Sequence, residues 1–289
     1  MTVESSRAGS PSFPSVETRH AASPGWMEVG GRRCRVFCAG PRPSVSGDDG
    51  DGAGCPLLVQ LVSERQEEDL EREAEMIFSG LDQLNTYHLP LNTVFVAVPV
   101  RDWELELMPW AEPAVSKRPE VGTGAGKTLR YLERGLPARD NGTQAASLRN
   151  TPPVILGGYS LAGLFALWAA CQTDRFGAVV AGSPSLWAGD WPGYAAGHAM
   201  RARQVYLSLG DREERSRNKT FARVGDRIRE EHRRLQQQLG EENTTLVWEE
   251  GGHFADPAAR MARGFVWCLS ENNPPACGGD PGNRGNHRF

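Results

Sequence analysis

Lysine is scarce in this chain of 289 residues. Only Lys117, Lys127 and Lys219 occur, and arginine supplies the other side-chain cations. Acidic residues outnumber the basic ones, so the formal net charge is -4 at pH 7. A protein that binds nucleic acid through its phosphates needs a basic surface. The charge balance therefore predicts no nucleic-acid partner.

Long apolar runs are also absent. No run approaches the roughly 20 apolar residues that a helix needs to cross a bilayer, so we predict no membrane span. The first residues, MTVESSRAGSPSFPSVETRH, lack a basic region followed by an apolar one. We therefore expect no secretory signal and take a cytoplasmic location as the default.

Metal-ligand spacing is missing from the cysteines. The chain has six of them but no Cys-x-x-Cys pair, which argues against a cysteine metal site. Cys34 and Cys38 lie four apart on an expected strand, so they share one face of it. We interpret them as buried free thiols.

Composition divides the chain into tails and one domain. Residues 1–24 are rich in Ser, Pro and Arg with few aliphatic side chains, and residues 270–289 have a similar tail-like composition. We expect both tails to be disordered and a single domain over 25–269. Within it, 40–54 and 137–151 are expected to be long loops.

Strand and helix patterns alternate through that domain. WMEV and RRCRVFC, separated by Gly30 and Gly31, predict an antiparallel hairpin. Further strands are predicted at 56–62, 92–100, 152–158, 177–183, 203–210 and 243–250, with helices between them. Such alternation predicts a mostly parallel sheet with helices on both faces. Sites in such sheets form at the carboxyl ends of the strands.

The stretch GGYSLAG (157–163) lies between an apolar strand and an apolar helix. A serine on a sharp strand-to-helix turn is typical of a nucleophile elbow, whose pattern is G-x-S-x-G. Here Ser160 has Gly158 two residues before it, but Ala162 two residues after it. A tight turn with a helix-capping serine would give the same pattern, so the motif alone does not decide.

A histidine and an acidic loop follow in the order that a Ser-acid-His triad needs. His253 comes just after the last predicted strand, in EEGGHFAD, and VYLSLGDREERS supplies Asp211, Glu213 and Glu214. We favour Glu213 as the acid, with Asp211 as second choice. Three elements in order, each just past a strand, predict a serine nucleophile with a histidine base.

Two further sets of residues complete the predicted site. An oxyanion hole would use the backbone N–H of Leu161 and a second donor near Ser63, although Ser63 with Gln66 also fits a helix capping box. Trp187 and Trp110 lie in loops and are candidates for a substrate pocket. Ordinary packing of these loops explains both tryptophans equally well.

A phosphate-loop resemblance in VGTGAGKT (121–128) fails on spacing. The pattern G-x-x-x-x-G-K-T requires glycine where Val121 stands, and no strand precedes it. We interpret it as the glycine-rich start of a helix over 127–136.

The motifs GGYSLAGLFALW, AGSPSLW, LSLGDREE and GGHF, with RDWELELMPW, resemble the esterase-D and siderophore-esterase-like branch of the α/β-hydrolases. The resemblance spans about residues 55–269 and implies an α/β-hydrolase fold with a Ser-His pair. Ala162 departs from the common glycine. Some related siderophore esterases manage without a firm acid, which leaves Glu213 the least secure of the three.

Together these observations predict a serine esterase that acts through an acyl-enzyme on a small-molecule ester, with no metal and no organic cofactor. A non-catalytic α/β-hydrolase-like binding module is the alternative from another class, and the intact triad order argues against it. A thioesterase or a peptidase would use the same three residues, so the sequence does not separate them from an esterase.

Overall fold

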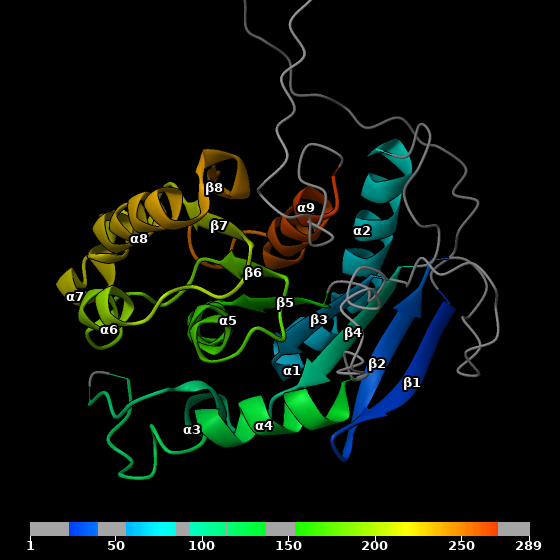
Figure 1. Ribbon diagram of the computed structural model, residues 1–289, viewed down its shortest axis with the longest axis horizontal. Coiled ribbons are helices and arrows are strands. Elements are labelled where there is room, and N and C mark those ends of the chain that lie inside the picture. Colours follow the sequence, from blue (N-terminus) through cyan, green and yellow to red (C-terminus); the bar gives the residue numbers. More distant parts are fainter. Residues whose placement is uncertain (1–22, 40–55, 85–92, 114, 137–153, 271–289) are drawn as a thin grey trace, which may run out of the picture.

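One eight-stranded sheet organises the computed structural model (Figure 1), which describes residues 23–39, 56–84, 93–113, 115–136 and 154–270. The strand order is β1-β2-β4-β3-β5-β6-β7-β8. The strands are β1 Ser23–Val29, β2 Arg32–Cys38, β3 Leu57–Val62, β4 Val94–Pro99, β5 Val154–Tyr159, β6 Ala178–Gly182, β7 Gln204–Gly210 and β8 Thr244–Glu249.

The predicted hairpin and parallel sheet are both confirmed. β1 pairs antiparallel with β2, which pairs antiparallel with β4. All other neighbours are parallel. The hairpin turn uses Gly30 and Gly31 at φ 55° and 86°, a left-handed conformation that glycine adopts without steric cost. β1 begins at Ser23, so the hairpin includes residues 23 and 24, which the composition places in the N-terminal tail.

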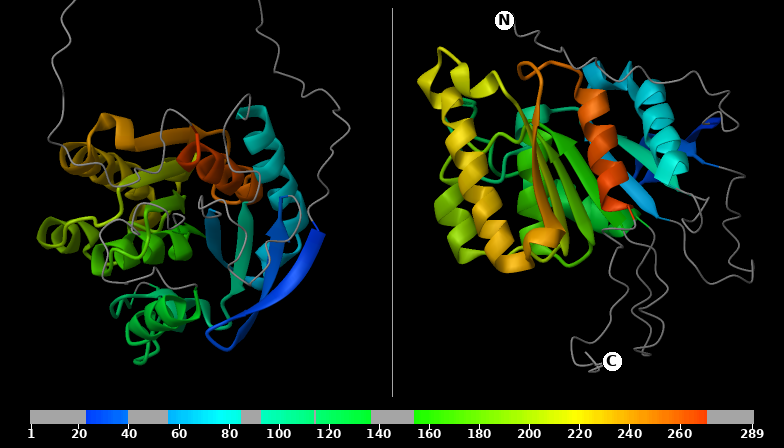
Figure 2. Two further views of the ribbon diagram at one scale, coloured as in Figure 1. Left: turned by 45° about the vertical axis from the view of Figure 1, so that its right-hand side comes forward. Right: turned by 90° about the horizontal axis from the view of Figure 1, so that it is seen from above.

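Helices cover both faces of the sheet (Figure 2). α2 Leu70–Leu84 and α9 Pro257–Cys268 lie side by side on one face. On the other face lie α4 Ala125–Gly135, α5 Leu161–Gln172 and α8 Val224–Leu239. α3 Trp103–Leu107 packs against α4 and α5, and α6 Trp191–Gly197 packs against α8. Short elements complete the described chain: α1 Glu64–Glu67, η2 Glu213–Arg215, α7 Lys219–Ala222 and η3 Glu241–Asn243.

Small residues bring α9 unusually close to the sheet. A Cβ on Gly157 of β5 would lie 2.4 Å from Cζ of Phe265, and a Cβ on Gly264 would lie 2.3 Å from Cγ1 of Val180 in β6. Both contacts are shorter than any side chain tolerates, so glycine is required on both sides. The consequence is that residues on the inner side of α9 reach the strand ends where the site forms.

The predicted elements differ from the observed ones mainly at their boundaries. The helix expected between the strands at 56–62 and 92–100 is divided into α1 and α2, and the one expected between the strands at 203–210 and 243–250 is divided into α7 and α8. The glycine-rich segment does open a helix, α4, which starts at Ala125. Most of the predicted disordered tails and the loops at 40–54 and 137–151 lie outside the described residues.

Cys34 and Cys38 are buried, as predicted, and Cys34 is a free thiol. Cys171 and Cys268 are also buried free thiols. Burial raises the pKa of Cys34 to about 11 and that of Cys171 to about 12. None of the described helices has both the length and the apolar character needed to span a bilayer. The described ranges also contain no cluster of three or more His, Cys, Asp or Glu side chains placed to hold a metal ion.

Candidate active site

Ser160 occupies a strained turn between β5 and α5. Its backbone has φ 60° and ψ −119°, a region that residues with a side chain rarely adopt. Two hydrogen bonds fasten the turn: the Ser160 N–H donates to the Gly182 carbonyl at 2.8 Å, and the Ser185 N–H donates to the Ser160 carbonyl at 3.0 Å. This is the geometry of a nucleophile elbow rather than of a simple helix cap.

The elbow leaves no room for larger residues. A Cβ on Gly158 would lie 2.3 Å from the Ala162 carbonyl oxygen and 2.8 Å from the Ala162 Cβ. Ala162 itself is fully buried. The methyl group that departs from the usual motif therefore fits, but only because the residue four positions earlier is glycine.

His253 lies in the loop between β8 and α9, and it bridges the serine and an acid. Its Nε2 is 2.9 Å from Oγ of Ser160, and its Nδ1 is 2.7 Å from Oε2 of Glu213. The imidazole is partly exposed, with 29% of its side-chain surface accessible, whereas the Glu213 carboxylate is buried. The three residues thus form a continuous hydrogen-bonded series from the Ser160 hydroxyl to the buried carboxylate.

The environment of Glu213 determines which atoms of the Ser160–His253–Glu213 series carry protons. Burial raises the pKa of Glu213, but hydrogen bonds from His253 and Ser183, the charge of His253 and the Gly210 N–H outweigh it and hold the pKa below its ordinary value. An ionised carboxylate only accepts hydrogen bonds, so Nδ1 of His253 carries the proton. Nε2 is then free to accept the proton of Ser160.

The structure separates the two acids that the sequence left open. Only Glu213 contacts the histidine. Asp211 accepts a hydrogen bond from the Gly251 N–H at 2.8 Å, which ties the loop that carries His253 to the end of β7. Asp211 therefore shapes the loop, and Glu213 faces the imidazole.

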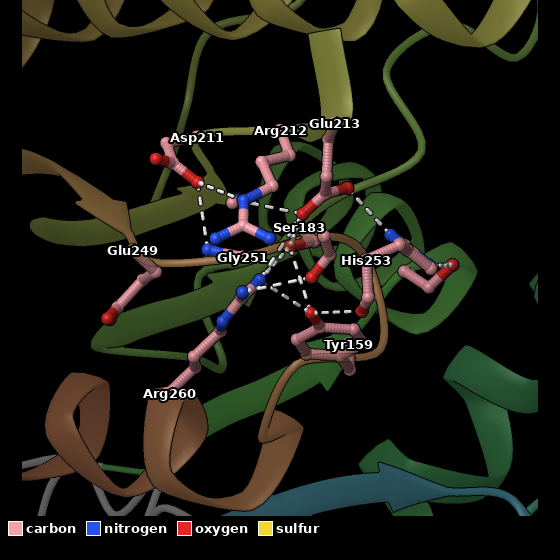
Figure 3. Close-up of polar contacts among 12 residues, drawn as sticks. Tyr159, Ser183, Asp211, Arg212, Glu213, Glu249, Gly251, His253 and Arg260 are labelled. Carbon is pink, nitrogen blue, oxygen red and sulfur yellow. Dashed lines mark hydrogen bonds and ion pairs between the residues drawn. The ribbon is translucent and has the colours of Figure 1, made fainter. Parts of the chain in front are cut away.

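Three residues outside the predicted set surround the acid (Figure 3). Oε1 of Glu213 accepts from Ser183 Oγ at 2.6 Å and from Arg260 Nη1 at 3.3 Å. Tyr159 Oη donates to the His253 carbonyl at 2.7 Å and accepts from Arg260 at 2.9 Å. Burial raises the pKa of Tyr159 to about 12, so it stays a neutral donor.

The comparisons with known proteins concern the fold. No family model and no curated protein matches the chain. Among solved structures, the siderophore hydrolase EstA from Aspergillus nidulans is 19% identical at a TM-score of 0.56, over 92% of this chain and 100% of that one.

Two other solved structures are comparably similar. EstB, a siderophore hydrolase from the same organism, is 17% identical over 91% of this chain and 99% of that one, at a TM-score of 0.57. An IroE-like serine hydrolase from Shewanella oneidensis is 18% identical over 84% of this chain and 79% of that one, at 0.54.

The fold is that of the α/β-hydrolases. In this fold, Ser160, Glu213 and His253 follow the carboxyl ends of β5, β7 and β8, which are the sheet positions where sites form.

The predicted oxyanion donors have different surroundings. Leu161 is the first residue of α5, so its N–H has no acceptor within the helix. The Ser63 N–H instead donates to Oε1 of Gln66 at 3.0 Å, which makes Ser63 a helix cap in this structure. A hydroxyl that the sequence analysis did not single out, Ser185 Oγ, lies 3.3 Å from Ser160 Oγ.

The two candidate pocket tryptophans also differ. Trp110 packs against Trp191 and Tyr194 of α6, with ring centroids 6.5 Å and 5.5 Å away. This is the loop packing that the sequence left open. Trp187 follows Ser185 by two residues and packs at a tilt against the partly exposed ring of Phe221, with the ring centroids 4.5 Å apart.

The rim beside the histidine is aromatic. Phe254 contacts the His253 ring at 5.0 Å between centroids, and 78% of its surface is exposed.

Glycine-to-alanine substitutions should have opposite effects inside and outside the crowded elbow. Gly158→Ala should destabilise the protein by about 1–3 kcal/mol, because the methyl group overlaps backbone atoms of Ala162. Gly126→Ala should stabilise it by about 0.5–1 kcal/mol, because Gly126 lies within α4 and its Cβ would only reach an ordinary contact with Arg130 at 3.5 Å. Urea unfolding followed by circular dichroism measures both, and equal effects would contradict the crowding argument.

Proposed function

We propose that this protein is a serine hydrolase that cleaves carboxylic esters through an acyl-enzyme. The observation that carries the proposal is the hydrogen-bonded chain from Ser160 through His253 to Glu213, at 2.9 Å and 2.7 Å, built on a strained elbow. The α/β-hydrolase fold supports it, because it presents these three segments at one edge of the sheet.

The geometry suggests the following reaction. Ser160 Oγ attacks the ester carbonyl carbon while its proton passes to Nε2 of His253. The imidazolium that forms is stabilised through Nδ1 by the Glu213 carboxylate. Collapse of the tetrahedral intermediate breaks the bond to the alcohol oxygen, which takes the proton from Nε2. A water molecule then attacks the acyl-enzyme with the same base and regenerates Ser160.

The oxyanion would be stabilised at the start of α5. The Leu161 N–H has the position after the nucleophile that this role requires. The Ser63 assignment loses support because its N–H is engaged by Gln66. The next residue, Glu64, begins α1 and has an N–H without an acceptor in that helix, and it is the better candidate in that loop.

The substrate is a small-molecule ester in this proposal. No metal or organic cofactor takes part in the steps above, and a cytoplasmic location remains a prediction of the sequence. Two of the similar structures are named siderophore hydrolases. A substrate panel should therefore contain a siderophore ester as well as nitrophenyl esters, a thioester and a peptide.

The nucleophile is tested by covalent labelling. A fluorophosphonate probe should label the wild-type protein, and Ser160→Ala should abolish labelling and lower kcat by about 10⁴-fold or more. Ser116→Ala changes a hydroxyl that only accepts from Arg118 and should leave both unchanged. Labelling that persists in Ser160→Ala would exclude Ser160, and a wild-type protein that does not label would favour the non-catalytic binding module.

The acid is tested by three amide substitutions. Glu213→Gln should lower kcat by about 10³–10⁴-fold, because the amide no longer fixes the tautomer of His253. Asp211→Asn should cost less than about 10-fold, since its Oδ1 still accepts from Gly251. Glu214→Gln is the matched control, because Glu214 pairs with Arg229 instead. Steady-state kinetics would reverse the assignment if Asp211→Asn had the largest effect.

The pocket role of Trp187 is tested by substrate preference. We expect Trp187→Ala to change the ratio of kcat/KM between short and long nitrophenyl esters by about 10-fold, because one large apolar contact is lost. Trp26→Ala removes an exposed tryptophan from β1, where its ring stacks on Arg33, and should leave the ratio unchanged. An unchanged ratio in Trp187→Ala would place this side chain outside the pocket.

A further inference from the structure

Helix α9 carries an arginine in an unusual place. Arg260 is 1% exposed and is among the largest fully buried side chains of the described residues. A buried guanidinium is strongly unfavourable unless charges and hydrogen bonds compensate it. An apolar residue of similar size would fill the same space without that cost, so the placement calls for an explanation.

The contacts of Arg260 join the segments that carry the candidate site. Nη1 donates to Tyr159 Oη at 2.9 Å, to Ser183 Oγ at 3.1 Å and to Glu213 Oε1 at 3.3 Å. Figure 3 shows the guanidinium pointing toward these three groups. The segments that it reaches are the end of β5, the residue after β6 and the short helix after β7.

The second guanidinium nitrogen holds the histidine loop. Nη2 donates to the carbonyl of Glu250 at 3.2 Å and to that of Gly252 at 3.0 Å. Gly252 directly precedes His253, and Tyr159 accepts from Arg260 while donating to the His253 carbonyl. One rigid, planar group therefore spans the acid and the backbone on which the base is mounted.

We propose that Arg260 is a positioning residue of the hydrolase, which orients the Glu213–His253 pair and compensates the charge of the Glu213 carboxylate. This inference rests on the proposed function. Arg260 acts through other residues: its hydrogen bonds reach the Glu213 carboxylate and the backbone that precedes His253, not the Ser160 hydroxyl or the imidazole. Its contacts leave Oε1 of Glu213 fully occupied, with Ser183 and the Gly210 N–H as the other donors, and present Oε2 to the imidazole.

The charge of Arg260 has a consequence for the pH range of the reaction. Arginine stays protonated at every accessible pH, so the buried Arg260–Glu213 pair is neutral overall. Protonation of His253 then gives the cluster a net positive charge. Without the guanidinium, the uncompensated carboxylate would favour the imidazolium more strongly, and the base would be lost at a higher pH.

The other titratable groups around this cluster allow the effect to be assigned. Tyr159 faces it from β5 and stays neutral, since burial raises its pKa to about 12. Asp211, after β7, bonds the Gly251 N–H and lies beside the exposed Arg212. On α9, Arg263 forms an exposed ion pair with Glu249 of β8 at 2.6 Å. None of these side chains forms a hydrogen bond with the Glu213 carboxylate in the part of the chain that the structure describes.

Arg263 provides a matched control, because it has the same residue type on the same helix. Arg260→Met, Arg260→Lys and Arg263→Met would be prepared in the full chain. The concentration of competent sites in each would be titrated with the fluorophosphonate probe. kcat and KM for a nitrophenyl ester would then be measured per titrated site across the pH range.

For Arg260→Met we expect kcat per site to fall by about 10²-fold with KM unchanged. The loss of the arginine should displace the His253 imidazole by up to about 1 Å from its hydrogen-bonding position beside Ser160. The acidic limb of the kcat/KM profile should move up by about one pH unit. Arg260→Lys keeps the positive charge but lacks the planar, forked guanidinium. Its kcat should therefore lie between those of the wild type and Arg260→Met, and the acidic limb of its kcat/KM profile should coincide with that of the wild type. Arg263→Met should match the wild type throughout.

Two results would overturn the proposal. The first is an Arg260→Met protein whose kcat per titrated site and pH profile equal those of the wild type, because Arg260 would then contribute only to stability. If Arg260→Met does not fold, Arg260→Lys decides alone, and an unchanged kcat per site contradicts the positioning role. The second is a wild-type protein that neither labels nor hydrolyses any ester, which would overturn the proposed function and this inference together.

Discussion

The buried carboxylate of Glu213 is the group around which this site is organised. Burial alone would favour its neutral form, but hydrogen bonds from His253, Ser183 and the Gly210 N–H hold its pKa below the ordinary value. Arg260 is a fourth donor. Those donors come from four different segments of the chain. Satisfying one buried charge therefore aligns the ends of β6, β7 and β8 with helix α9.

Helix α9 has two functions in this arrangement, and both depend on its distance from the sheet. Its apolar side fills the core against β5 and β6, where Gly157 and Gly264 permit a close approach. The same approach brings Arg260 to the strand ends. A larger residue at either glycine would move the helix outward and withdraw the guanidinium from the carboxylate, so core packing and the geometry of the site are coupled.

Ser160 is held by a different set of constraints. Ser160 has a strained backbone conformation, and backbone hydrogen bonds to Gly182 and Ser185 maintain it. The strain is local, whereas His253 and Glu213 are positioned by long-range contacts. The proposed hydrolase thus combines a stiff elbow with a histidine loop that is tied to β7 by Asp211 and to α9 by Arg260.

Residue patterns alone predicted the hairpin and the parallel sheet, and they placed Ser160, an acidic loop and His253 after successive strands. These features follow from local periodicity and from the rule that sites form at strand ends. Which of two nearby acids faces the imidazole, and the role of Arg260, emerged only from the fold. From the sequence alone, an arginine on a helix is expected to face solvent. Its burial depends on how segments that are distant along the chain pack together, which residue patterns do not reveal.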